Sequence, residues 1–131
     1  MLLTIRFFPL AAISFFGFIL WIIIISDTGG PNVLIDSVRA IPHGDKFGHM
    51  SLYCVLAVLV NFSLKPRTQQ YFGLTLGCAL VLVFALFEEL SQYFFPLTRT
   101  LDIQDAMADC FGVYVAAWIA RLTRNVAEAK R

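Results

Sequence analysis

Long stretches without a charged side chain are the feature that most restricts how this chain can fold. Residues 7–26 form a run of twenty residues with no formal charge, and further uncharged runs cover residues 47–64 and 68–87. At a helical rise of about 1.5 Å per residue, about twenty residues cross the roughly 30 Å hydrocarbon core of a bilayer. Each of these runs is therefore long enough to form a transmembrane helix.

A fourth apolar segment begins with acidic residues. The stretch from Ile103 to Ala120 contains Asp105 and Asp109 near its start, and the rest of it is strongly apolar. Charged residues make up only 15% of the chain, whereas soluble domains carry about 25%. We therefore predict an all-α, polytopic membrane protein, with one domain over residues 1–131 that forms a four-transmembrane-helix bundle. The predicted helices cover about residues 7–26, 47–64, 70–94 and 103–122, followed by a cytoplasmic tail over 123–131.

The segments between the predicted spans have the composition of turns. Residues 27–46 are rich in glycine and proline and are predicted to form a loop, and Lys65, Pro66 and Arg67 are predicted to form a short turn. The three cysteines lie far apart in apolar stretches, without the spacing of a zinc site or a disulfide framework. No basic surface with interleaved aromatic residues indicates nucleic-acid binding.

The lysines and arginines predict the orientation. If the N-terminus is cytoplasmic, the cytoplasmic segments hold seven of them and the opposite segments three. The first set is Arg6, Lys65, Arg67, Arg121, Arg124, Lys130 and Arg131, and the second is Arg39, Lys46 and Arg99. Because cytoplasmic segments carry the excess of basic residues, we predict that both termini are cytoplasmic and that the protein lies in a bacterial inner or plasma membrane.

Polar residues gather at the outer ends of three predicted helices. Asp45, His49 and Tyr53 are spaced i, i+4, i+8 and share one helix face. Glu88 or Glu89 lies one turn before Gln92, and Asp102, Asp105 and Asp109 form a stripe at the start of the last helix. Carboxylates at membrane depth usually face the bundle interior and find partners there. We predict an outward-facing polar site formed by Asp45, Lys46, His49, Tyr53, Glu89, Gln92, Arg99, Asp102, Asp105 and Asp109. The alternative is that these charges pair only to hold the bundle together.

These same residues carry a family resemblance. The patterns Asp45-Lys46-x-x-His49-x-x-x-Tyr53, Glu89-x-x-Gln92 and Arg99-Thr100-x-Asp102-x-x-Asp105-x-x-x-Asp109-x-x-Gly112, in this order, resemble the VanZ-like family of small bacterial membrane proteins. The resemblance implies a cell-envelope protein, and it links the family's name-giving member to resistance to the glycopeptide teicoplanin. It implies no mechanism. This chain has Asp109 where the family usually has asparagine, which adds a potential charge to the site.

Three functions agree with this pattern. In the first, the site binds a lipid-linked or peptidoglycan-related envelope molecule, with Arg99 and Lys46 holding a phosphate or carboxylate. In the second, a membrane-embedded enzyme uses His49, Glu89 or Asp105 for acid-base or metal-assisted transfer on a lipid-linked substrate, with acidic residues of the last helix as ligands of a divalent cation. In the third, Asp109 and His49 belong to a transporter or proton relay. The first function requires no cofactor, and its partners are the lipid bilayer and the envelope molecule.

Overall fold

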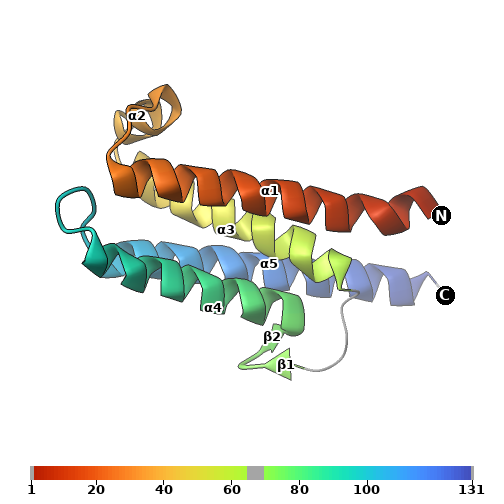
Figure 1. Ribbon diagram of the computed structural model, residues 1–131. Coiled ribbons are helices and arrows are strands. Elements are labelled where there is room, and N and C mark those ends of the chain that lie inside the picture. The colour runs from red at the N-terminus through yellow and green to blue at the C-terminus, as the bar shows by residue number, and fades with distance from the viewer. Residues whose placement is uncertain (1, 65–69, 131) are drawn as a thin grey trace.

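The computed structural model describes residues 2–64 and 70–130 and is mostly helical. Its four long helices, α1 (Leu2–Thr28), α3 (Gly44–Ser63), α4 (Leu76–Ser91) and α5 (Ile103–Ala129), lie side by side (Figure 1). Helix α1 begins and α5 ends at the same end of this bundle (Figure 1). Each of the four lies in a segment long and apolar enough to cross a membrane. The predicted all-α fold with four spans is confirmed.

A short helix, α2 (Val33–Arg39), interrupts the segment predicted to be only loop. Asn32 caps it, because its side-chain oxygen accepts hydrogen bonds from the backbone N–H groups of Leu34 and Ile35 at 2.9 and 3.3 Å. The chain then turns tightly into α3 at Gly44, where a Cβ atom would collide with the carbonyl oxygen of Val38. As a result α2 packs against α3 at the end of the bundle away from the N-terminus (Figure 1).

The helix predicted over residues 70–94 begins later than expected, because residues 70–75 form a hairpin. Strand β1 (Gln70–Tyr71) pairs antiparallel with β2 (Leu74–Thr75), and Phe72 and Gly73 join them with φ angles of 53° and 77°. Positive φ cannot continue a right-handed helix. Helix α4 therefore starts at Leu76, and after Ser91 it tightens into one 3₁₀ turn, η1 (Gln92–Phe94).

Other helix ends also differ from the prediction, and α3 begins at Gly44 rather than at residue 47. Helix α1 extends beyond the predicted 7–26 in both directions, and α5 continues to Ala129, so that most of the predicted tail over 123–131 is helical. The turn predicted at residues 65–67 lies outside the described residues.

Helix α3 is the centre of the packing. It contacts α5 most extensively and also packs against α4 and α1. Small side chains allow this, since Ala57, Cys78 and Ala85 are fully buried between the helices. Helix α5 comes very near α3 at Gly112, where a Cβ atom would collide with the backbone carbonyl oxygen of Met50. The α3–α5 distance thus depends on this glycine.

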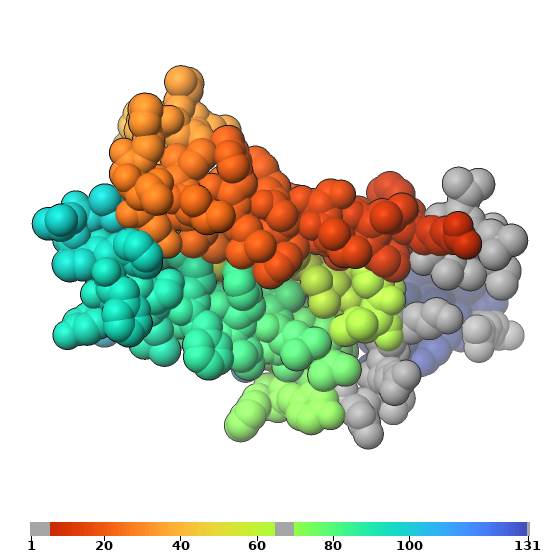
Figure 2. Space-filling model, in the orientation of Figure 1, coloured from red at the N-terminus to blue at the C-terminus, as the bar shows by residue number. Residues whose placement is uncertain are grey.

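Large apolar side chains cover the outside of the bundle. Ile13 on α1, Phe87 on α4 and Trp118 on α5 are 70%, 68% and 60% exposed. Helices α1 and α4 make up most of the face seen in Figure 2. An apolar surface this extensive is unfavourable in water and is stable against lipid chains. The fold is that of a multi-pass membrane protein.

Candidate functional site

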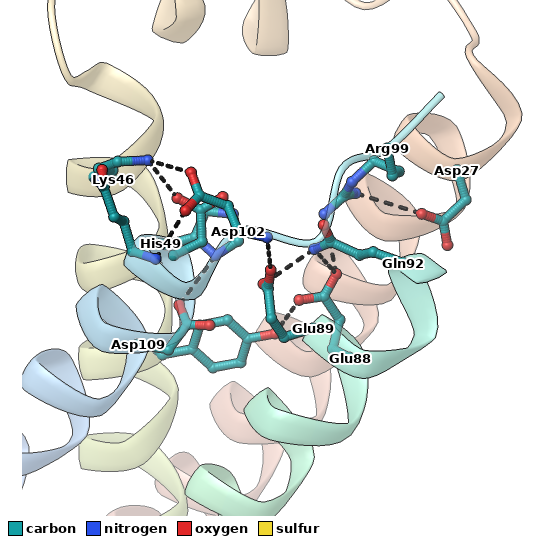
Figure 3. Close-up of polar contacts among 12 residues, drawn as sticks. Asp27, Lys46, His49, Glu88, Glu89, Gln92, Arg99, Asp102 and Asp109 are labelled. Carbon is teal, nitrogen blue, oxygen red and sulfur yellow. Dashed lines mark hydrogen bonds and ion pairs between the residues drawn. The ribbon is translucent and has the colours of Figure 1, made fainter. Parts of the chain in front are cut away.

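The predicted site residues meet at the end of the bundle that carries α2. The start of α3, the end of α4 with η1, the end of α1 and the start of α5 all lie there (Figure 1). Hydrogen bonds and ion pairs join eleven side chains, here called the polar network (Figure 3). They are Asp27, Lys46, His49, Tyr53, Glu88, Glu89, Gln92, Arg99, Asp102, Asp105 and Asp109.

Lys46 ties α3 to the start of α5. Its Nζ atom lies 3.0 Å from Asp102 Oδ2 and 2.9 Å from Asp105 Oδ1. Asp102 is also the N-cap of α5, accepting a hydrogen bond from the backbone N–H of Gln104 at 2.8 Å. The N–H of Gln104 and the ammonium of Lys46 both stabilise the ionised carboxylate, so the pKa of Asp102 lies below its ordinary value.

His49 of α3 pairs with the buried Asp109 of α5. His49 Nδ1 lies 3.0 Å from Asp109 Oδ1, and the opposite ring nitrogen, Nε2, lies 3.9 Å from Asp105 Oδ2. Asp105 and Asp109 are one helical turn apart on α5, and both therefore face the His49 ring. Asp109 is completely buried, and its Oδ2 atom has no hydrogen-bond partner among the described residues.

Glu88 and Glu89 are both buried at the end of α4, although they are adjacent in the sequence. Gln92 holds them together, because its Nε2 donates to Glu88 Oε1 at 3.2 Å and to Glu89 Oε2 at 3.1 Å. The backbone N–H of Asp102 donates to Glu89 Oε1 at 3.0 Å, and the Tyr53 hydroxyl donates to Glu88 Oε2 at 3.4 Å. Figure 3 shows both glutamates directed toward Gln92.

Arg99 connects the network to α1. Its Nη2 lies 3.2 Å from Glu88 Oε1, and its Nη1 lies 3.4 Å from Asp27 Oδ1. The side chains of Arg99 and Asp27 are each 12% exposed and that of Glu88 is 4% exposed. Three separate segments are therefore joined by a charge cluster that water reaches poorly.

A cavity of about 410 Å³ lies beside the network. Its lining is mixed. The apolar part comes from α1, α2 and α3, with Ile19, Ile22, Ile23, Leu34, Ile35, Val38 and Leu52. The polar part includes Arg39, His49, Glu88, Gln92, Arg99 and Asp105. The cavity can therefore take a molecule with an apolar chain at one end and hydrogen-bonding groups at the other.

The structure brings nine of the ten predicted site residues into the polar network, all except Asp45. Asp45 is exposed and lines the cavity, and its side chain makes no hydrogen bond to the described part of the chain. Glu88 and Asp27 belong to the network but were not among the predicted site residues. The spacing of Glu88, four residues before Gln92, was a signal for it; Asp27 has no comparable signal, because its partner Arg99 is 72 residues away.

The polar network carries more negative than positive charge. Its six carboxyl groups face two permanent cations, Lys46 and Arg99, which leaves a formal charge of minus four, or minus three if His49 is protonated. Both cations already contact two carboxylates each. A divalent cation, or a ligand rich in hydrogen-bond donors, would be attracted to such a site.

A family model described as VanZ/LLP1 matches residues 4–124. Comparison with curated proteins and with solved structures gave no match. The matched range begins within α1 and ends within α5, so it includes all eleven residues of the polar network.

Proposed function

The chain belongs to the VanZ/LLP1 family, and from this premise we propose that it binds an amphipathic, lipid-linked molecule of the cell envelope in the cavity beside the polar network. The observation that carries the proposal is the mixed lining of the cavity, in which apolar side chains of α1 and α2 accompany polar side chains of the network. Its volume of about 410 Å³ falls in the range of about 300–1,000 Å³ that is typical of small-molecule sites. An acyl or isoprenoid chain would lie along α1 and α2, with its head group against α3 and α4.

The charges of the site favour one type of head group. From the sequence, Arg99 and Lys46 were predicted to bind a phosphate or carboxylate of the ligand. In the structure, each of them already pairs with two carboxylates of the protein. An anion bound to Arg99 or Lys46 would have to displace one of these partners, and the other basic side chain in the cavity lining is Arg39 of α2. Hydroxyl, amide and amino groups, as in sugars and peptides, can instead donate hydrogen bonds to the excess carboxylates. The head group we propose is therefore rich in donors.

The binding proposal predicts the effect of narrowing the cavity. Ile22 lines the cavity from α1, whereas Ile24, two residues along, is 61% exposed on the outside of the bundle. Replacing Ile22→Trp should fill the apolar side and reduce photo-crosslinking to a diazirine-labelled, lipid-linked envelope precursor at least tenfold. Ile24→Trp is the matched control and should crosslink as the wild type does. Equal labelling of the two variants would show that the lipid binds elsewhere.

A membrane-embedded enzyme is the second candidate, and the His49–Asp109 pair favours it. Asp109 holds one ring nitrogen at 3.0 Å while His49 also lines the cavity, the arrangement of a general base positioned by a carboxylate. Turnover of phospholipid or polyprenyl phosphate by the wild type, lost in His49→Ala, would support this candidate. Tight binding of such lipids without turnover would exclude it for these substrates.

The packing weighs against transport through a single chain. Between the polar network and the other end of the bundle, the interior is filled by apolar side chains such as Leu56, Ala57, Val113 and Ala117, none more than 4% exposed. Polar contact returns at the far end, where Thr75 donates to Asn61. A proton or solute would need a continuous polar route. Proton flux into liposomes that contain the protein, absent from empty liposomes, would restore the transport alternative.

The orientation that we propose has both termini in the cytoplasm and the cavity at the outer face. The excess of lysine and arginine in the segments at the terminal end supports it. The start of α1 and the end of α5 lie together at one end, as this orientation requires (Figure 1). A C-terminal alkaline phosphatase fusion should be inactive and a fluorescent protein fusion bright; the opposite pair of results would reverse the orientation.

A further inference from the structure

Four side chains of the polar network are close enough to share one ion. His49, Glu88, Glu89 and Asp109 each offer one ligand atom, and these atoms all lie within 4.8 Å of one another. The four come from α3, α4 and α5, and the three carboxylates are buried. We propose that they bind one divalent transition-metal ion of the Zn²⁺ or Mn²⁺ type.

One oxygen of Asp109 is a second, independent observation in favour of a bound ion. Asp109 is 0% exposed, and its Oδ2 has no hydrogen-bond partner among the described residues. A buried carboxylate oxygen without a donor is unfavourable, and such groups are rare in folded proteins. Coordination of a cation would satisfy this oxygen.

The charge of the site favours a cation as well. The polar network has a formal charge of minus four with a neutral His49, and a divalent ion would halve it. Buried carboxylates repel each other strongly because their surroundings have a low dielectric constant. A cation that lies between them offsets this repulsion. Protonation of the carboxyl groups is the competing way to remove the charge, and metal binding can be distinguished from it by experiment.

Neighbouring groups already hold the four ligands in place. Gln92 donates to both Glu88 and Glu89, and the N–H of Asp102 fixes the second oxygen of Glu89. His49 Nδ1 and Asp109 Oδ1 are 3.0 Å apart, so the carboxylate that carries the unsatisfied Oδ2 is held against the histidine ring.

The opposite side of the His49 ring faces a second carboxylate, beyond hydrogen-bond distance. Its Nε2 faces Asp105 Oδ2 at 3.9 Å, and Asp105 is held in turn by Lys46. A carboxylate that moved to hydrogen-bond distance of this nitrogen would orient the ring and make the other nitrogen a better ligand. Asp105 and Lys46 would therefore support the ion without touching it.

The donor set selects the type of ion. Three carboxylates and one imidazole suit Zn²⁺, Mn²⁺ and similar transition ions, whereas Mg²⁺ and Ca²⁺ prefer oxygen ligands alone. A second set, Asp45, His49 and Asp105, also lies within 4.8 Å, but Asp45 is exposed and this set lacks the unsatisfied oxygen. We therefore assign the ion to the four-residue set. The assignment does not rest on the proposed lipid ligand.

The test is a metal titration of the full chain in detergent, after a chelator has removed bound ions and with no lipid substrate present. Zn²⁺ is measured by competition with a chromophoric chelator, and Mn²⁺ by the loss of its free electron paramagnetic resonance signal. We expect one site per chain, unaffected by a large excess of Mg²⁺. Asp109→Asn and Glu89→Gln should each weaken binding at least tenfold, and the matched control Asp45→Asn should bind as the wild type does.

X-ray absorption of the zinc-loaded wild type gives a readout that does not depend on a variant folding. It should show nitrogen and oxygen ligands at about 2.0–2.1 Å with one imidazole. A wild type without a stoichiometric site overturns the proposal, as does loss of binding in Asp45→Asn with binding kept in Asp109→Asn. Because Ile22→Trp fills the cavity without changing these ligands, it should bind the ion normally, so failure of the metal site and failure of the lipid site give different results.

Discussion

Replacing Arg99→Ala should lower the free energy of unfolding by about 3 kcal/mol, because removing one partner of a buried ion pair leaves the other charge uncompensated. Arg99 is the cation next to both Glu88 and Asp27, and all three side chains are mostly shielded from solvent. Glu88 would keep the hydrogen bonds from Gln92 and Tyr53, while Asp27 would lose its ion pair. The measurement is thermal or denaturant unfolding in detergent micelles, followed by circular dichroism.

A second substitution separates this electrostatic cost from other effects of the change. Glu88→Gln in the Arg99→Ala background removes one of the two uncompensated charges, so the double variant should recover about 1 kcal/mol relative to Arg99→Ala, a coupling within the range seen for contacting residues. If Arg99→Ala unfolds at the wild-type midpoint, the pairs contribute nothing to stability, and Arg99 is then free to contact a ligand.

Gly112→Ala should destabilise the bundle by about 2 kcal/mol, since overpacking of a closely packed interior costs about this much. The added Cβ would collide with the carbonyl oxygen of Met50 and lie 3.2 Å from the backbone nitrogen of Cys54, so α3 and α5 would have to separate. Gly112 lies one turn after Asp109 on α5, and the separation should also part Asp109 from His49. We expect a lower unfolding midpoint together with weaker metal binding.

Gly17→Ala is the matched control for this prediction. Gly17 is also a glycine inside a long helix, but a Cβ atom there meets nothing within 4 Å among the described residues. Alanine is the better helix former by about 1 kcal/mol, so this variant should be as stable as the wild type or more stable. Equal behaviour of the two alanine variants would mean that α3 and α5 tolerate a wider spacing than the structure shows.

The helical spans could be predicted from the sequence, because absence of charge over about twenty residues is a strong and local signal. The hairpin could not, since Phe72 and its neighbours are as uncharged as the helix that follows. The positive φ angles at Phe72 and Gly73 prevent α4 from beginning at residue 70, and a phenylalanine does not predict a positive φ angle. Helix α2 was not predicted, because it has only seven residues and lies between segments whose glycine and proline residues are typical of loops.

The polar network was predictable wherever helical spacing is informative. The i, i+4 relation of Asp105 and Asp109, and the position of His49 on α3, are local features that predict a shared face. The pairings are not local: Lys46 meets Asp105 over 59 residues and His49 meets Asp109 over 60. For this reason the sequence indicated which residues gather but not that Arg99 and Lys46 are already neutralised, and this second fact changes the head group that we propose.

The network also has a consequence for how the protein is assembled in its membrane. Asp27 precedes Arg99 by 72 residues, and Glu88 precedes it by 11. Since a chain is synthesised from its N-terminus, the first and third membrane helices are made before their shared counter-ion exists. Insertion of α4 with two unpaired glutamates is unfavourable until the segment that carries Arg99 and Asp102 follows. The segment between α4 and α5 therefore supplies the counter-ion that α1 and α4 share, and because Asp105 and Asp109 lie on α5, the site is complete only after this last helix has been made.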